Sequence, residues 1–190
     1  MIAAAGRGPV TAMGISKSGN MLVRLAVTAP SLVRRLVLMG TPLDTTPGSM
    51  SLVPSEQDDR FRTALRAGDL ERAMHHFVAT VVSDPDTGEL AEQFTRNLLR
   101  LPRESILSTW TPDPELDISP ILGQVKVPTL VLHGTDDHRV SVAAAHYLAR
   151  HIPDARLHLF EGRGHLPIFT ATAEFCEVLR RFVRTGDAGP

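Results

Sequence analysis

Short apolar-rich runs alternate with helical periodicity along most of this chain, and this alternation limits its fold more than any other property of the sequence. The apolar-rich runs occupy residues 10–13, 33–39, 127–133 and 156–160. Helical periodicity covers residues 16–29, 142–151 and 171–183. Strands that are apolar on both faces belong in a parallel sheet covered by crossover helices. The sequence therefore predicts an α/β fold with parallel strands.

A block of different character interrupts the alternation in the middle of the chain. Ser55, followed three residues later by an acidic residue, is typical of a helix start. A further helix is expected over residues 90–101, ended by Pro102, and the proline-rich stretch around Trp110 is expected to be a loop. The predicted division is an α/β core formed by residues 1–42 and 125–190, and a helical insert formed by residues 43–124.

The composition excludes several classes of function. Lys and Arg number 20 against 21 Asp and Glu, so the chain lacks the basic excess of a nucleic-acid or anionic-membrane binder. No apolar run is long enough to span a bilayer, and no signal-peptide pattern precedes Gly8, so a cytoplasmic location is expected. The single cysteine, Cys176, excludes an intramolecular disulfide, and no metal-ligand spacing appears. Neither a metal nor another cofactor is expected.

The sequence GISKSG at residues 14–19 lies between the first predicted strand and the first predicted helix. A strand that turns at once into a helix strains the residue at the turn and lifts its side chain clear of the sheet. Such a turn needs small residues on each side, which Gly14 and Ser18 provide. The pattern resembles the Gly-x-Ser-x-Gly nucleophile elbow of the α/β-hydrolase family, with Ser18 in place of the second glycine. Ser16 is preferred to Ser18 as the nucleophile, because Asn20 would be too bulky beside Ser18. The alternative is an ordinary turn in which Ser16 caps the helix.

The resemblance implies a catalytic triad in the chain order serine, acid, histidine. Asp137, which follows the third predicted strand, matches the family's Gly-x-x-Asp loop, and Asp136 is the alternative acid. His165 lies in a glycine-rich loop after the last predicted strand, as the family histidine does. In this interpretation Ser16 attacks, His165 moves the proton and Asp137 orients His165. The backbone N–H of Lys17 would hold the oxyanion.

The resemblance further implies hydrolysis of a small-molecule carboxylic ester, thioester or lactone through an acyl-enzyme. A serine nucleophile disfavours the dehalogenase and epoxide-hydrolase branches, which use a carboxylate. Two alternatives keep the same motif: a non-catalytic remnant that serves as a binding module, and a perhydrolase or haloperoxidase-like activity. The insert occupies the place of the family's lid. Its large apolar residues either line a substrate pocket or pack its own core, and these are Met74, Phe77, Phe94 and Trp110.

The stretch before the elbow is short in comparison with the family pattern. Only thirteen residues precede Gly14, so the sheet is expected to be partial, without the first four strands and the second oxyanion loop. Met1 is accordingly interpreted as an internal methionine of a longer hydrolase. The strand that begins at Val10 would then be an exposed edge through which chains could self-associate.

Overall fold

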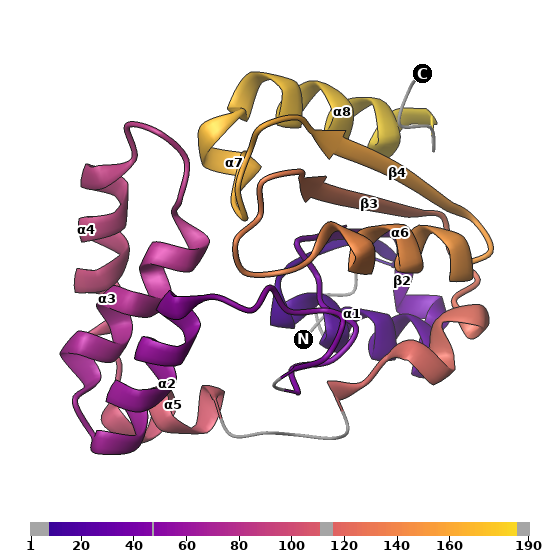
Figure 1. Ribbon diagram of the computed structural model, residues 1–190. Coiled ribbons are helices and arrows are strands. Elements are labelled where there is room, and N and C mark those ends of the chain that lie inside the picture. Colours follow the sequence, from indigo (N-terminus) through magenta and orange to yellow (C-terminus); the bar gives the residue numbers. More distant parts are fainter. Residues whose placement is uncertain (1–7, 47, 111–115, 186–190) are drawn as a thin grey trace.

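A computed structural model describes residues 8–46, 48–110 and 116–185 (Figure 1). Within these residues the chain forms a four-stranded parallel sheet in the order β1-β2-β3-β4. The strands are β1 (Val10–Ile15), β2 (Val33–Met39), β3 (Thr129–Gly134) and β4 (Ala155–Phe160). The predicted α/β class is therefore confirmed, and each predicted strand overlaps an observed one.

Helices cover both faces of the sheet. They are α1 (Lys17–Thr28), α6 (Val142–His151) and α8 (Thr172–Thr185). Alternate residues of β2 point to opposite faces: Leu36 and Leu38 join a buried cluster with α1 and α6, whereas Val37 and Met39 join another with α8. Figure 1 shows α8 across the sheet from α6. Burial on both faces explains why the strands are apolar throughout.

The buried face of α1 differs from the predicted apolar stripe. Met21 is one of the apolar residues that give residues 16–29 their helical periodicity, but it is 60% exposed, whereas Asn20 is fully buried. The Asn20 side-chain amide donates to the carbonyls of Pro42, Leu43 and Leu116 at 3.0, 3.2 and 2.8 Å. The face of α1 is set by the tight turn that precedes it, and a buried polar side chain is stable there because its donors are satisfied.

The middle of the chain contains more helix than predicted. Its elements are α2 (Glu56–Ala67), α3 (Leu70–Val81), α4 (Gly88–Leu98), α5 (Arg103–Thr109) and the 3₁₀ helix η4 (Ser119–Gln124). Ser55 caps α2 as predicted, accepting from the backbone N–H of Asp58 at 3.1 Å. The prediction of a loop around Trp110 is wrong over α5 and η4, where the chain is helical. Pro102 is the residue before α5 and Pro120 lies in the first turn of η4, where a missing N–H costs nothing. Pro112 and Pro114 lie outside the described residues.

Helices α2 to α5 gather beside the sheet, on the side toward which the arrowheads of β3 and β4 point (Figure 1). They share a core of their own, which includes Phe61, Met74 and Ile106. A short helix not predicted from sequence, α7 (Pro167–Thr170), follows the loop that carries His165. The carboxyl ends of the strands therefore face a helical layer, which is the usual position of a ligand site in parallel sheets.

The described helices include none that is both long and apolar enough to cross a membrane. Strand β1 pairs only with β2 and forms one edge of the described sheet. Self-association through that edge stays a prediction.

Candidate active site

The turn between β1 and α1 holds Ser16 in a strained conformation, with φ 53° and ψ −133°. Its backbone N–H donates to the carbonyl of Met39 at 2.8 Å, which ties the turn to the end of β2. The Ser18 hydroxyl accepts a hydrogen bond from the backbone N–H of Ile15 at 2.8 Å and donates one to the Ile15 carbonyl at 2.7 Å. The two serines thus differ: Ser18 braces the turn, and Ser16 occupies the strained position.

Tight packing against backbone atoms at Gly14, and against a side chain at Gly19, explains the glycines of the turn. A Cβ at Gly14 would lie 2.7 Å from the Cα of Gly19, and a Cβ at Gly19 would lie 2.1 Å from Oγ1 of buried Thr41. The second small residue that the turn requires is therefore Gly19, one position later than in the family pattern. This explains how Ser18 is tolerated.

Replacing Gly14 with alanine is expected to destabilise the fold by about 1–3 kcal/mol or more, because the new methyl group meets backbone atoms that no rotamer change can move. The free energy of unfolding in urea measures the effect. Gly123→Ala is the matched control, since a Cβ there meets nothing within 4 Å. Equal stability of the two variants would contradict the tight approach.

Asp137 lies just after β3 and is 7% exposed. One carboxylate oxygen accepts from the backbone N–H groups of Arg139 and Val140 at 2.7 and 2.9 Å. The other lies 2.6 Å from Nδ1 of His165. Burial by itself raises the pKa of Asp137, but the charge and hydrogen bond of His165 and the Val140 N–H outweigh it, so the pKa is lowered below its ordinary value. Asp136 is exposed, and the structure favours Asp137 as the partner of His165.

His165 is 2% exposed, and its position depends on two other parts of the chain. Gly40, with φ 55°, leaves room for the ring: a Cβ there would lie 2.8 Å from Cε1 of His165. The buried carboxylate of Asp84 accepts from the N–H of Gly164, the preceding residue, at 3.0 Å. Because the ionised Asp137 accepts from Nδ1, the lone pair of the neutral ring lies on Nε2. This nitrogen is buried and has no hydrogen-bond partner among the described residues.

A second histidine contacts the same carboxylate. His133, on β3, is 1% exposed; its Nε2 lies 2.9 Å from the carbonyl of Val140 and 3.3 Å from Asp137. Burial lowers the pKa of His133, although the charge of Asp137 opposes the shift. Neutral His133 can donate its Nε2 proton to the carbonyl of Val140, which holds the ring beside Asp137. No sequence motif singles out His133, Asp84 or Gly40. The partners of Asp84 and Gly40 are distant along the chain, and His133 belongs to an apolar strand.

Lys17 is the first residue of α1, so its backbone N–H is among those that have no acceptor within the helix. Its side-chain ammonium donates to the carbonyl of Thr109 at 2.8 Å and links the turn to the end of α5. Ser16 and Lys17 border a cavity of about 110 Å³. We call it the Ser16 cavity, and its other walls include Arg62, Phe77, Trp110 and Arg139. Phe77 and Trp110 thus line a cavity, whereas Met74 packs in the core shared by the helices and Phe94 packs edge-to-face against Phe169.

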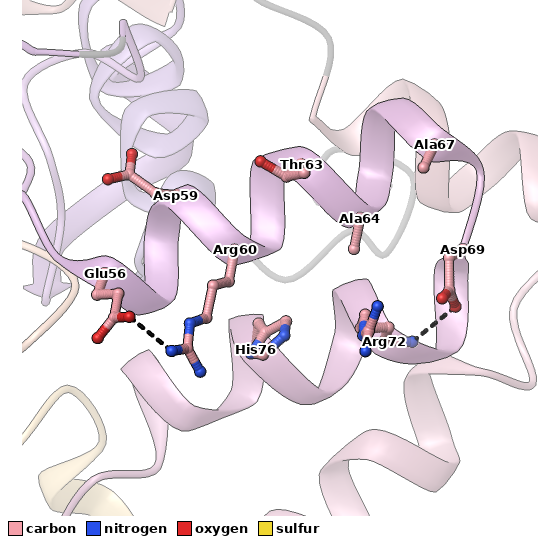
Figure 2. Close-up of a pocket in the computed structure, with 9 residues that line it drawn as sticks. All are labelled: Glu56, Asp59, Arg60, Thr63, Ala64, Ala67, Asp69, Arg72 and His76. Atoms are coloured by element: carbon pink, nitrogen blue, oxygen red, sulfur yellow. Dashed lines mark hydrogen bonds and ion pairs between the residues drawn. The ribbon is translucent and has the colours of Figure 1, made fainter.

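A second hollow of about 500 Å³ lies along α2 and α3 (Figure 2). Figure 2 shows the ion pair between Arg60 and Glu56 at one end of this hollow. At the other end Asp69 accepts a hydrogen bond from the backbone N–H of Arg72. His76 also faces the hollow. Ser16 is not among its lining residues, whereas it borders the Ser16 cavity, so the strained serine associates the candidate site with that cavity. The buried pair of Asp137 and His165 lines neither of the two. In the described part of the chain, no group of three or more His, Cys, Asp and Glu side chains is arranged to hold a metal ion.

Comparisons with known proteins agree with this architecture. A family model described as the alpha/beta hydrolase fold matches residues 1–172. The pimeloyl-[acyl-carrier protein] methyl ester esterase of Nitrosomonas europaea is 30% identical over 88% of this chain and 69% of its own length. The 2-hydroxymuconate semialdehyde hydrolase of Pseudomonas putida is 29% identical, over 93% and 63%. The chain thus spans about two thirds of the length of these relatives.

Solved structures show the same fold. A hydrolase from Oleispira antarctica superposes with a TM-score of 0.83 at 15% identity, covering 97% of this chain and 68% of its own. Together with the parallel sheet, the strained serine turn and the family match over most of the sequence, this establishes the classification. The chain belongs to the α/β-hydrolase fold family.

Proposed function

We propose that this chain is a serine hydrolase that cleaves a carboxylic ester, thioester or lactone through an acyl-enzyme. The observation that carries the proposal is the buried contact of 2.6 Å between Asp137 and Nδ1 of His165, at the strand ends where Ser16 occupies a strained turn. The similarity to an esterase and to a hydrolase of other organisms supports the reaction class.

In the proposed reaction the same groups act in both steps, the acylation of Ser16 and the hydrolysis of the acyl-enzyme. Ser16 Oγ attacks the ester carbonyl while Nε2 of His165 removes its proton, and the resulting imidazolium is stabilised by the ionised Asp137. The backbone N–H of Lys17 faces the oxyanion of the tetrahedral intermediate. His165 then returns the proton to the leaving oxygen or sulfur, or to the ring oxygen of a lactone. Water, activated by the same nitrogen, hydrolyses the acyl-enzyme and regenerates Ser16.

We further propose that the insert, residues 43–124, acts as a lid over the core. The hydrogen bond from Lys17 to Thr109 and the presence of Phe77 and Trp110 in the wall of the Ser16 cavity support this role. The ring centroids of Phe77 and Trp110 are 4.8 Å apart in an edge-to-face arrangement, which fixes this wall of the cavity.

Labelling with a fluorophosphonate tests the function directly, because the reagent phosphonylates only an activated serine. Peptide mass spectrometry is expected to find the adduct on Ser16. Ser16→Ala is expected to abolish labelling. The Ser18 hydroxyl is hydrogen-bonded to the backbone, so Ser18→Ala should still be labelled on Ser16. Absence of an adduct from the wild-type chain, or undiminished labelling of Ser16→Ala, would reject the serine hydrolase and favour the non-catalytic alternative.

A further inference from the structure

The Ser16 cavity has an excess of positive charge in its walls. Lys17, Arg62 and Arg139 all line it, and among the described lining residues there is no acidic side chain. The Lys17 ammonium already donates to the carbonyl of Thr109, whereas an uncharged acyl or alcohol group would give Arg62 and Arg139 no anion to bind. Their presence beside the proposed nucleophile therefore bears on what the substrate carries.

One carboxylate behind the cavity wall pairs with both guanidinium groups. Asp58 forms an ion pair with Nη1 of Arg139 and another with Nε of Arg62, the latter at 2.6 Å. The side chains of Arg62, Arg139 and Asp58 are only 24%, 12% and 15% exposed. Two partly buried positive charges thus share one negative charge, and a second anion would lower the cost of their burial.

The remaining nearby groups do not supply that anion. Asp137 accepts from the backbone N–H of Arg139, but its carboxylate is already hydrogen-bonded to His165. Burial lowers the pKa of Arg139; Asp58 and Asp137 oppose this shift, and the positive charge of Arg62 adds to it. The guanidinium nevertheless stays charged in proteins. Counting Lys17, three cations line the Ser16 cavity, and Asp58 is the carboxylate that pairs with two of them.

Aromatic rings hold the Arg139 guanidinium in place. Its central carbon lies 5.3 Å from the ring centroid of Phe77 and 5.8 Å from that of Phe61. The Phe61 ring in turn packs edge-on against Trp110, with centroids 5.4 Å apart. A guanidinium fixed between rings and one carboxylate is arranged in advance, so it loses little freedom when it binds a ligand.

We propose that the substrate carries a carboxylate that binds to Arg139 and Arg62 in the Ser16 cavity, so that the preferred ester is a short anionic one. The planar guanidinium presents paired N–H donors that match the two oxygens of a carboxylate. The volume of about 110 Å³ suits a short group rather than a long acyl chain. This inference rests on the proposed serine hydrolase function and specifies its substrate class.

Matched esters test the proposal by turnover. Monomethyl succinate is compared with methyl 4-methylpentanoate, in which an isopropyl group replaces the carboxylate of the acyl part. Acetoxyacetate is compared with isobutyl acetate, which makes the same exchange in the alcohol part. At least one anionic ester is expected to exceed its neutral partner in kcat/KM by about 10–100-fold, as expected for hydrogen bonds to a charged group.

The arginines are then tested by the ratio of the two kcat/KM values. Arg139→Met and Arg62→Met are each expected to reduce the preference for the anionic ester by about tenfold or more. Arg60→Met, an exposed arginine on the same helix as Arg62, is the matched control and should keep the preference (Figure 2). A neutral ester preferred in both pairs, or a preference unchanged in both Arg139→Met and Arg62→Met, would overturn the proposal.

Binding to the Ser16→Ala chain separates this inference from the catalytic proposal, because binding needs no turnover. Titration calorimetry with both anionic esters is expected to give a dissociation constant about 10–100-fold below that of the neutral partner for at least one pair, and a loss of this difference when Arg139→Met is added. Equal binding of anionic and neutral esters would reject the carboxylate site even if the chain hydrolyses neutral esters. Selective binding by Ser16→Ala, combined with no turnover of these esters by the wild-type chain, would support the carboxylate site and reject the catalytic function.

Discussion

Replacing His165 with alanine is expected to lower hydrolysis of a p-nitrophenyl ester by about 10⁶-fold, the scale on which removal of a triad histidine acts in serine hydrolases. The physical reason is that a serine hydroxyl is a weak nucleophile unless a neighbouring base takes its proton. The unpartnered Nε2 of His165 is the proposed base. Initial rates, corrected for the uncatalysed reaction, measure the loss, and fluorophosphonate labelling of Ser16 should slow in parallel.

The matched control is another histidine outside the site. His158, on β4, pairs with Glu174 on the surface at 2.9 Å, so His158→Ala should leave the rate within a few-fold of the wild type. If His165→Ala keeps a rate similar to that of His158→Ala, the base is a different residue and the assignment of His165 fails.

Replacing Asp137 with asparagine is expected to lower the same rate by about 10⁴-fold. An asparagine amide can direct an N–H group at Nδ1 of His165, which favours the tautomer whose proton lies on Nε2. That nitrogen can then no longer accept the Ser16 proton. Asp136→Asn is the matched control, since Asp136 is exposed and adjacent in sequence. A larger loss in Asp136→Asn than in Asp137→Asn would make Asp136 the acid of the triad.

The effect of Asp137→Asn on the free energy of unfolding is also expected to depend on pH. Because the pKa of Asp137 is lowered in the folded state, its ionised form contributes stability at pH values above its unfolded pKa of about 3.9. That contribution is lost as pH falls through the folded-state pKa. The free energy of unfolding of Asp137→Asn should therefore lie below that of the wild type near neutral pH, and the gap should narrow below about pH 4. A gap that does not change with pH would contradict the lowered pKa.

Much of the core of this fold could be predicted from local sequence patterns. The residues of β2 and α6 are bounded by turn residues and match the predicted ranges, and the small residues around Ser16 indicate a tight turn. Helix α5 was missed because Pro102 was interpreted as an end. The same residue also suits the start of a helix, and only packing of Ile106 against the core of the other helices decides between the two.

The sequence by itself determined the order of the four strands and of helices α1, α6 and α8, the tight turn at Ser16 and the loops that carry Asp137 and His165. These depend on periodicity and on residues a few positions apart. Only the tertiary structure decided that Asp58 pairs with Arg139, 81 residues away, and that Asp84 holds the loop before His165, 80 residues away. Such contacts form where separate elements pack, so no local pattern encodes them. For that reason the charge of the Ser16 cavity, and with it the proposed substrate class, emerged only from the folded chain.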